Sequence, residues 1–274
     1  MTLKEALAQA AARDVARIDA QVLLLHVLGR EGAGRGWLLA HDDEALAGGD
    51  GARFEALCAR RLAGEPVAYL TGEKEFFGLP LQVDARVLVP RPDTETIVEW
   101  SLQVLQDRKA PRLIDLGTGS GAIALAIQHA RPDAVVEAVD RSADALAVAS
   151  ANAQRLGLPV RFRQASWLDG AGRYDLVVSN PPYIRADDEH LPDLAHEPLG
   201  ALISGPDGLA DLRAIVAGAR DHLLPGGWLL LEHGWDQAEA VRGLLQAAGF
   251  VDVASRRDLA GIERCSGGRR LELG

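Results

Sequence analysis

The sequence predicts an α/β protein whose larger part is a doubly wound, Rossmann-like sheet. Between residues 93 and 274, short apolar segments typical of buried strands alternate with segments of helical periodicity. A glycine-rich turn follows the first of these strands, and an acidic residue ends the second, as in nucleotide-binding half-folds. This alternation of strands and helices implies a single sheet with right-handed crossovers.

Length and composition agree with a globular protein of two parts. The chain has 274 residues, of which 48% are hydrophobic and 25% are charged, so it can fill a sizeable core. The formal net charge is −10, and the pI is about 5.2. This charge argues against broad electrostatic attachment to nucleic acid or to an anionic membrane surface.

The two cysteines, Cys58 and Cys265, have no metal-ligand spacing. We therefore expect free thiols in a reducing compartment and no metal site. The first five residues lack a signal-peptide pattern, and no apolar run approaches the ~20 residues that span a bilayer. These observations predict a cytoplasmic protein.

The first 75 residues have a helical pattern and predict a small bundle. One expected helix carries apolar residues at intervals of three or four positions, Ile18, Val22, Leu25 and Leu28, and we expect these to form its apolar face, which Leu23, Leu24 and Val27 widen. A later helix carries a second apolar stripe: Phe54, Leu57, Cys58 and Leu62. Gly64-Glu65-Pro66 is expected to end it. We expect His26 and His41 to be structural or surface histidines.

Between the bundle and the sheet, two β-like runs flank Gly78-Leu79-Pro80 and predict a hairpin. A helix then extends to about Gln106, and Thr94 or Asp93 is expected to cap it. A plain linker would not need paired aromatic residues and the rigid Pro90-Arg91-Pro92, so we expect this segment to fold near the active cleft. The predicted domains are a helical domain (1–75), a hairpin linker (76–92) and a sheet domain (93–274).

The sheet domain begins with a nucleotide-type half-fold. A strand is predicted over Arg112–Leu116, followed by the turn Gly117-Thr118-Gly119-Ser120-Gly121 and a helix from Ala122 to about Ala130. Glycines allow the turn to adopt positive φ and allow a ligand to approach the backbone. A second strand, Ala134–Val139, ends in Asp140, whose carboxylate suits the two hydroxyls of a ribose. This pattern occurs in both NAD and S-adenosylmethionine sites, and the G-x-G-x-G spacing alone does not decide between them.

Asn180-Pro181-Pro182-Tyr183 is the most informative segment of the chain. It follows a buried strand, Tyr174–Ser179, and the two prolines cannot extend that strand. The chain must leave the sheet in a stiff turn at its carboxyl edge, where open α/β folds bind ligands. The Asn180 carbonyl oxygen and a proline carbonyl can each accept a hydrogen bond from a planar –NH2 group, and Tyr183 can supply an aromatic face. Methyl transfer to an amide or amine needs such a clamp, whereas hydride transfer does not.

The remaining pattern completes the sheet. The expected elements are strands at 160–163 and 228–232, the latter after a turn at Pro225-Gly226-Gly227, helices at about 207–223 and 236–248, and an antiparallel pair at 250–253 and 270–273. Residues 184–206 form a long loop after the Asn180 turn, and we interpret it as a substrate-facing flap. Glu197 could position a target in that loop, or it could be a solvated charge.

Several segments of the chain are found together in one known family. They are Glu65-Pro66-Val67-Ala68-Tyr69-Leu70-Thr71-Gly72, Glu75-Phe76-Phe77-Gly78, Val89-Pro90-Arg91-Pro92-Asp93-Thr94-Glu95, Asp115-Leu116-Gly117-Thr118-Gly119-Ser120-Gly121 and Asn180-Pro181-Pro182-Tyr183-Ile184. With these segments the chain resembles the protein-(glutamine-N5) methyltransferases that modify peptide chain release factors. The resemblance covers about residues 18 to 270, and residues 258–264 are similar to the family's final loop. The glycine turn and the Asn-Pro-Pro-Tyr segment are shared with many amino-methyltransferases, whereas the other segments are more specific.

The resemblance implies a class I methyltransferase fold with S-adenosyl-L-methionine as methyl donor and S-adenosyl-L-homocysteine as product. It implies that Gly117 to Gly121 approach the methionine part, that Asp140 holds the ribose, and that Trp167 lines the adenine side. Without the resemblance, Trp167 could equally be a core aromatic residue. Asn180 would touch both the cofactor and the target. The implied catalytic and substrate-binding residues are Asn180, Pro181, Pro182 and Tyr183.

The chemistry of this reaction favours alignment over a strong base. A glutamine amide nitrogen is a weak nucleophile, because its lone pair is delocalised. The Asn180 side chain and the Pro181 carbonyl would hold both amide hydrogens, so that the nitrogen can pyramidalise and attack in line. No general base is evident in the sequence.

The expected partner is a release factor, recognised by residues 1–75, and the enzyme is expected to be a monomer that binds neither nucleic acid nor a membrane. One alternative is methylation of a ribosomal-protein glutamine, although those sister enzymes usually depart from this chain after Pro-Arg. A second alternative is methylation of adenine N6 or cytosine N4 in nucleic acid, which the net charge of −10 disfavours. A third is a non-enzymatic module that keeps a nucleotide fold for assembly.

Overall fold

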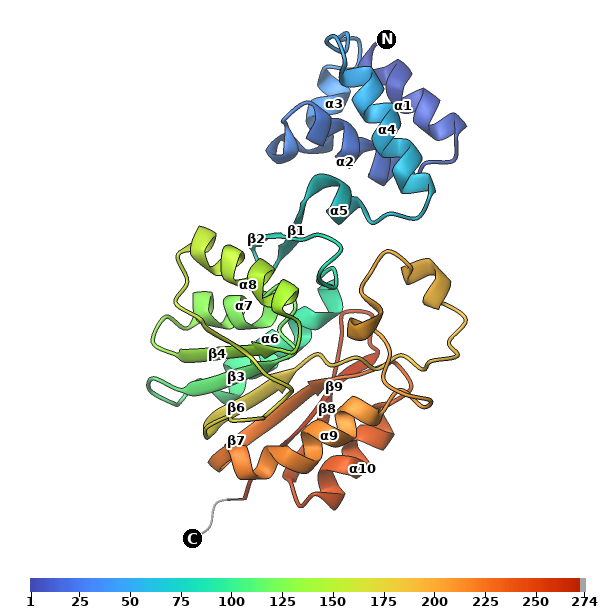
Figure 1. Ribbon diagram of the computed structural model, residues 1–274. Helices are drawn as coiled ribbons and strands as arrows, with labels where there is room; N and C mark the ends of the chain where they lie inside the picture. The colour runs from blue at the N-terminus through green and yellow to red at the C-terminus, as the bar shows by residue number, and fades with distance from the viewer. Residues whose placement is uncertain (272–274) are drawn as a thin grey trace. The chain divides into compact units, whose positions relative to one another are not determined.

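The computed structural model describes residues 1–271 and divides the chain into two compact units (Figure 1). Unit 1 comprises Met1–Glu73 together with Pro192–His196, and unit 2 comprises Lys74–Leu191 and the residues from Glu197 onward. The domain boundaries derived from the sequence, 1–75, 76–92 and 93–274, remain predictions.

Unit 1 is a bundle of short helices around one apolar core. The first helix begins with a capping box, in which the Thr2 hydroxyl accepts the Glu5 N–H at 3.2 Å and the Glu5 carboxylate accepts the Thr2 N–H at 2.8 Å. The helices are α1 (Leu3–Ala12), α2 (Arg17–Val27), η1 (Glu31–Ala33), α3 (Gly34–Ala40), α4 (Asp50–Leu62) and α5 (Val67–Thr71). Both cysteines of the chain, Cys58 here and Cys265 in unit 2, are free thiols, as predicted.

The prediction for the buried face of α2 is partly wrong. Ile18 is 55% exposed and Val22 is 40% exposed, whereas Leu23 and Leu24 are fully buried. The helix carries more apolar residues than one face can hold, so its periodicity alone could not select the face that packs on the neighbouring helices. Two large apolar side chains of α2 are therefore left at the surface of unit 1.

The predicted hairpin is present in unit 2. It consists of β1 (Glu73–Phe76) and β2 (Leu79–Gln82), and the turn is at Phe77-Gly78, both with positive φ. Pro80 lies inside β2 rather than in the turn, because a two-stranded hairpin leaves one side of each strand without a partner strand. The hairpin belongs to unit 2 except for its first residue.

The main sheet of unit 2 has seven strands in the order β5-β4-β3-β6-β7-β9-β8. Its strands are β3 (Arg112–Leu116), β4 (Val135–Asp140), β5 (Arg161–Gln164), β6 (Tyr174–Ser179), β7 (Leu223–Glu232), β8 (Val251–Arg257) and β9 (Glu263–Arg269). The first five strands in this order are mutually parallel, and β9 pairs antiparallel with β7 and with β8. The strand order reverses between β3 and β6, which is the switch point where such sheets bind ligands.

Helices cover both faces of this sheet, so the predicted doubly wound class is confirmed (Figure 1). One face carries α6 (Glu95–Val104), α7 (Ala122–Ala130) and α8 (Ala143–Leu156), and the other carries α9 (Ala210–Ala219) and α10 (Ala238–Ala247). Alternate strand residues serve the two faces. Leu113 and Leu176 lie in one core, and their neighbours Ile114 and Val177 lie in the other.

The predicted strands agree with the structure within one residue at β3, β4, β5 and β6. The exception is β7, which starts at Leu223, so the predicted turn Pro225-Gly226-Gly227 lies inside the strand. A Cβ on Gly227 would lie 2.9 Å from the Leu224 carbonyl oxygen and 3.1 Å from that of Asp175. Gly227 therefore allows a close approach of two backbones. The segment between Leu223, which pairs with Tyr174, and Trp228, which pairs with Leu176, lies out of register, and Gly226 in it has a φ of 73°, so the predicted turn is present as an irregularity within the strand.

The predicted partner of the last strand pair is also wrong. The segment paired with β8 is β9, Glu263–Arg269, and not 270–273, of which Glu272 and Leu273 lie outside the described residues. β9 contains Gly267 and Gly268 and lacks an alternating apolar pattern. A Cβ on Gly267 would lie 2.4 Å from Leu230 Cδ2, so close packing against β7 requires a residue type that strand propensity disfavours.

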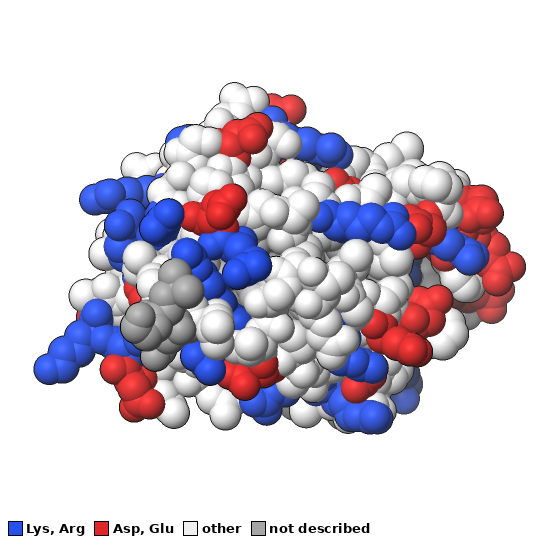
Figure 2. All heavy atoms as spheres, turned by 90° about the horizontal axis from the view of Figure 1, so that it is seen from below, with Lys and Arg blue, Asp and Glu red and all other residues white. Residues whose placement is uncertain are grey.

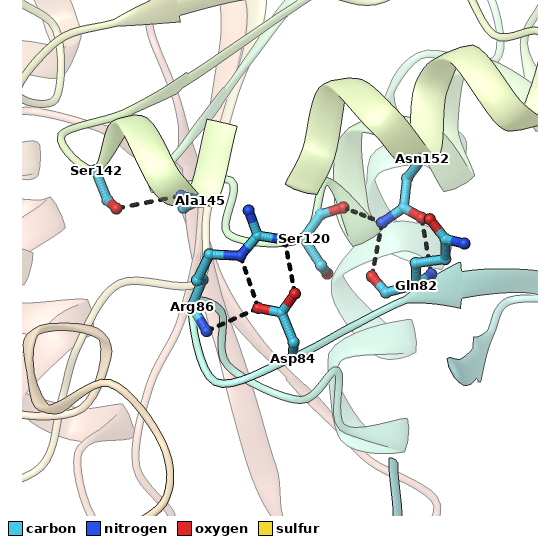
Figure 3. A network of polar contacts seen from close by, with 7 residues as sticks. All are labelled: Gln82, Asp84, Arg86, Ser120, Ser142, Ala145 and Asn152. Atoms are coloured by element: carbon cyan, nitrogen blue, oxygen red, sulfur yellow. Dashed lines mark hydrogen bonds and ion pairs between the residues drawn. The ribbon is translucent and has the colours of Figure 1, made fainter. Parts of the chain in front are cut away.

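The helix α8 shapes the site, although no motif in its sequence predicts this. Ser142 caps it by accepting the Ala145 N–H at 3.2 Å (Figure 3). Further along, the buried Asn152 donates to the carbonyls of Gln82 and Ser120, both at 3.0 Å, and accepts the Gln82 N–H at 2.7 Å (Figure 3). One amide side chain thereby ties the hairpin to the glycine turn.

Candidate active site

The glycine turn between β3 and α7 is a tight, positive-φ segment at the carboxyl edge of the sheet. Gly117, Gly119 and Gly121 have φ values of 69°, 55° and 86°. A Cβ on Gly121 would meet Leu125 Cδ1 at 3.0 Å and Ala149 Cβ at 3.2 Å, so this glycine allows α7 to pack on α8. Around Gly119, by contrast, the space for a Cβ is open. A ligand can therefore approach the backbone at Gly119.

Asp140 connects the turn to α8. Its carboxylate accepts the Gly119 N–H at 3.0 Å through one oxygen and the Ser142 N–H at 2.9 Å through the other. Each carboxylate oxygen can accept more than one hydrogen bond. The side chain is thus fixed in place and still able to accept hydroxyl hydrogens of a ligand.

A second carboxyl group lies beneath the turn. Asp115 is buried, and its Oδ2 accepts the Thr118 hydroxyl at 2.7 Å. Burial raises the pKa of Asp115 to about 7, although the hydrogen bond from Thr118 opposes this shift. The Thr118 side chain therefore supports the turn from below.

A cavity of about 270 Å³ opens above the turn. It is lined by Arg86, Val87, Leu88, Gly117, Gly119, Asp140, Arg141, Ser142, Ala145, Ala165, Ser166, Trp167, Asn180, Pro182, Pro198, Gly200 and Ala201. Trp167 forms one wall, and a Cβ on Gly117 would lie only 3.3 Å from its Cζ3. Glycine backbone, a fixed carboxylate and a flat aromatic ring on one cavity fit a nucleoside that carries an amino-acid tail.

The structure thus brings together six of the residues chosen from the sequence on one cavity: Gly117, Gly119, Asp140, Trp167, Asn180 and Pro182. The other chosen residues do not line it: Thr118, Ser120, Gly121, Pro181 and Tyr183. Thr118 and Ser120 are buried within the turn. Tyr183 instead directs its hydroxyl to Glu232 Oε1 at 3.4 Å, which limits its freedom to act as an open aromatic face.

The Asn180 amide is oriented by a neighbour that the sequence offered only as a helix cap. Its Nδ2 donates to the Thr94 hydroxyl at 3.3 Å. Thr94 occupies the N-cap position of α6, as predicted, but its side chain makes no capping hydrogen bond. Because the NH2 group of Asn180 is engaged by Thr94, the carbonyl oxygen is the atom available to accept a hydrogen bond on the cavity side.

Glu197 fastens part of the long loop to the segment before α6. It is 5% exposed, its Oε2 accepts the Val89 N–H at 3.0 Å, and its Oε1 accepts from the Arg91 guanidinium. Three residues after it, the Gly200 carbonyl accepts from Arg141 at 2.6 Å. The reading of Glu197 as a solvated charge is therefore wrong. We call residues 197–201 the strap, because it contributes Pro198, Gly200 and Ala201 to the cavity wall.

Sequence reasoning missed the other cavity residues, although weak signals were present. Arg141 and Ser142 directly follow Asp140, and Val87 and Leu88 directly precede the segment Val89-Pro90-Arg91-Pro92. Arg86 is held toward Asp84 by hydrogen bonds of 2.9 and 2.6 Å (Figure 3). The contribution of the strap had no sequence signal, because it depends on how a long loop folds.

The chemistry open to this site also depends on possible metal ligands, membrane-spanning helices and the charge of the surface. Within residues 1–271, no group of His, Cys, Asp or Glu side chains could hold a metal ion. Across that part of the chain, no helix is long and apolar enough to cross a membrane. Figure 2 shows Lys and Arg side chains interspersed with Asp and Glu on the face it presents, rather than one continuous basic field.

Two family descriptions match the chain. Residues 2–72 match the PrmC N-terminal domain, and residues 98–199 match the methyltransferase small domain. A release factor glutamine methyltransferase of Bordetella pertussis is 56% identical over 257 residues, covering 92% of this chain and 94% of the relative. One of Burkholderia pseudomallei is 53% identical over 263 residues, covering 92% and 91%.

A solved structure agrees with the fold. The 16S rRNA N2 G1207 methyltransferase of Thermus thermophilus, in complex with AdoMet and guanosine, superposes with a TM-score of 0.55. Its sequence is 17% identical, and the match covers 72% of this chain and 49% of that protein. At this identity the likeness concerns the sheet and its helices alone.

Proposed function

The chain belongs to the family of release factor glutamine methyltransferases, and from this premise we propose how its residues perform the reaction. It is an S-adenosylmethionine-dependent enzyme that methylates a glutamine side-chain amide of a peptide chain release factor. When bound, the cofactor supplies a methyl group on a sulfonium. The chain must then bind the cofactor, hold the glutamine amide in line with that methyl group, and exclude competing water.

The orientation of Asn180 is the observation that carries the proposal. Its amide lines the same cavity as Gly119 and Asp140, and its Nδ2 is engaged by Thr94. The carbonyl oxygen is then an acceptor fixed in direction before the target arrives. Together with the Pro181 carbonyl it would hold the two hydrogens of the glutamine amide and stabilise the positive charge that develops on nitrogen.

The other roles follow from the cavity. Asp140 would accept the ribose hydroxyls, and the Gly117–Gly121 turn would lie along the amino-acid tail. Trp167 would cover the adenine. Pro182 would close the wall beside the target, and Tyr183 would hold the turn through its hydroxyl rather than stack on the substrate. This set supports transfer by alignment, and no residue in it is positioned as a strong base.

The alternatives are not favoured. The Bordetella and Burkholderia relatives span more than nine-tenths of the chain and carry the release factor name, and they favour neither a ribosomal protein nor a nucleic acid as acceptor. A net charge of −10 also disfavours a nucleic-acid groove. We further propose that the enzyme acts as a monomer in the cytoplasm, where release factors work, and that it engages no membrane.

Labelled methyl transfer to purified release factors tests the proposal. The purified enzyme, S-adenosylmethionine carrying a labelled methyl group and an intact factor should give one labelled glutamine, located by mass mapping after proteolysis. A factor in which that glutamine is replaced by glutamate should take up no label. Label on another residue type, or label on RNA in the absence of a factor, would exclude the proposal.

A further inference from the structure

A buried carboxyl group lies next to the Asn180 turn, and the mechanism described above does not use it. Glu232 is the last residue of β7, and its neighbour Leu231 pairs with Ser179, the residue that precedes Asn180. Glu232 is 2% exposed. Its Oε2 is buried without a hydrogen-bond partner among residues 1–271. A buried carboxyl oxygen without a hydrogen-bond partner destabilises the fold, and this cost indicates a purpose other than stability.

Glu232 faces both residues that hold the catalytic turn. The Tyr183 hydroxyl donates to its Oε1 at 3.4 Å. The Thr94 side chain is a polar neighbour that lowers its pKa, and Thr94 in turn accepts from Asn180 Nδ2 at 3.3 Å. Glu232 thus lies next to both Thr94, which contacts Asn180 at the start of the turn, and Tyr183, the last residue of the turn.

From this geometry we propose that Glu232 is a positioning residue for methyl transfer: through Thr94 it sets the direction of the Asn180 amide, and through Tyr183 it holds the turn. A carboxylate accepts hydrogen bonds and cannot donate. The Thr94 hydroxyl hydrogen is drawn toward Glu232, so the Thr94 oxygen turns a lone pair to Asn180 Nδ2. The Asn180 carbonyl oxygen is then left facing the target amide. This inference rests on the proposed function, since it assigns Asn180 the role of the clamp.

The surroundings of Glu232 make its protonation state responsive to pH. Burial raises its pKa to about 7, the polar contact with Thr94 opposes the shift, Asp93 adds to it, and Arg264 and Tyr183 oppose it. Cys265 on β9 pairs with Glu232 on β7 and is itself buried. Below pH 7 a protonated Glu232 can donate to Thr94, and the Thr94 hydroxyl is then no longer held as an acceptor for Asn180.

Glu232→Gln tests the proposal with little change in volume. We expect kcat to fall by about 10- to 100-fold, the scale on which loss of alignment reduces rates. The Kd for S-adenosylmethionine and the KM for the release factor should change by less than about twofold. The parent enzyme should lose kcat as the pH falls through 7, and the variant should lack this decline.

Two further variants distinguish positioning from a structural role. Glu137→Gln is the matched control, because Glu137 also lies on a strand and accepts a tyrosine hydroxyl, that of Tyr174 at 2.9 Å, but does not line the cavity. Its kcat should equal that of the parent. Thr94→Val should reproduce the loss, Thr94→Ser should restore activity, and Thr94→Val combined with Glu232→Gln should be no worse than either alone.

The outcomes separate the two ideas. If Asn180→Ala is inactive and Glu232→Gln keeps the parental kcat between pH 6 and 9, the positioning role of Glu232 is wrong, whereas the role of Asn180 as the amide clamp is supported. An equal loss of kcat in Glu137→Gln would also overturn it. If Asn180→Ala keeps full activity, the clamp itself is wrong. Glu232→Gln that binds S-adenosylmethionine normally and transfers slowly supports the inference.

Discussion

The Asn180 side chain is the residue on which the proposed chemistry depends most directly. Replacement by Ala removes the fixed acceptor while leaving the half-buried turn and its two prolines in place. We expect kcat to fall by about 10²- to 10³-fold, as for loss of one preorganised polar group at a reacting centre. Asn180→Asp should lose less, because a carboxylate still accepts hydrogen bonds, although it can no longer donate to Thr94.

The measurement is single-turnover methyl transfer to an intact factor, with thermal unfolding as a check on the fold. Both variants should unfold within about 2 °C of the parent, because the side chain contributes little to either core. Near-parental turnover by Asn180→Ala on a natural factor would rule out the amide clamp.

Asp140 carries a separate prediction about cofactor affinity. Asp140→Ala loses an acceptor for ribose hydroxyls and also two backbone contacts, from Gly119 and Ser142. Hydrogen bonds to a charged group contribute roughly 1.5–3 kcal/mol each, so we expect a Kd about 10- to 100-fold higher by calorimetry. Asp144→Ala is the control, because Asp144 is an exposed acidic residue that follows Asp140 closely in the chain. This variant should bind S-adenosylmethionine as the parent does. Equal affinity in the two variants would count against a ribose at Asp140.

At the scale of elements, the sequence predicted those segments whose pattern reflects their final surroundings. β3 and β6 are buried on both faces and have mainly apolar sequences without strict alternation, so their limits were found correctly. β9 was missed because Gly267 and Gly268 are dictated by packing against Leu230 and Phe250, which the local sequence does not reveal. Gly119, Asp140 and Asn180 could be chosen for the cavity because each belongs to a local motif that follows or ends a strand. The strap could not be chosen, because its place depends on how a long loop folds.

The strap also gives a prediction at this scale. Glu197→Ala removes the contacts to Val89 and Arg91 that anchor it, and leaves Arg91 without its carboxylate. We expect amide hydrogen exchange over residues 87–91 and 197–204 to quicken by about tenfold or more, because local opening becomes easier. The Kd for S-adenosylmethionine should rise several-fold, since the strap forms part of the cavity wall.

Glu189 offers a matched control within the same loop, because its side chain is 90% exposed. Glu189→Ala should leave both exchange and cofactor binding unchanged. Unaltered exchange at Val89 in Glu197→Ala would show that the strap is held by other contacts.

For the whole molecule, the question is how a catalytic clamp that would accept any small amide acts on one protein. Specificity requires contacts outside the clamp, and unit 1 has a surface suited to them. Ile18 and Val22 are one helical turn apart on α2 and are exposed, and Leu62 on α4 is 49% exposed. The ion pair between Asp19 and Arg61, at 2.7 Å, brings those parts of α2 and α4 together. We propose that this apolar surface of unit 1 binds the release factor.

Replacing Ile18 and Val22 together by Ser in the full-length enzyme tests that proposal. Because both side chains are largely exposed, the thermal unfolding temperature should change by only a few degrees. The KM for an intact release factor should rise about tenfold, while methylation of a short peptide carrying the same glutamine should be unchanged. Leu271→Ser is the control: Leu271 is 51% exposed and follows β9 at the edge of the sheet opposite Asn180, so both substrates should be methylated normally. An unchanged KM for the intact factor in the double variant would show that this surface does not bind it, and discrimination would then have to come from unit 2.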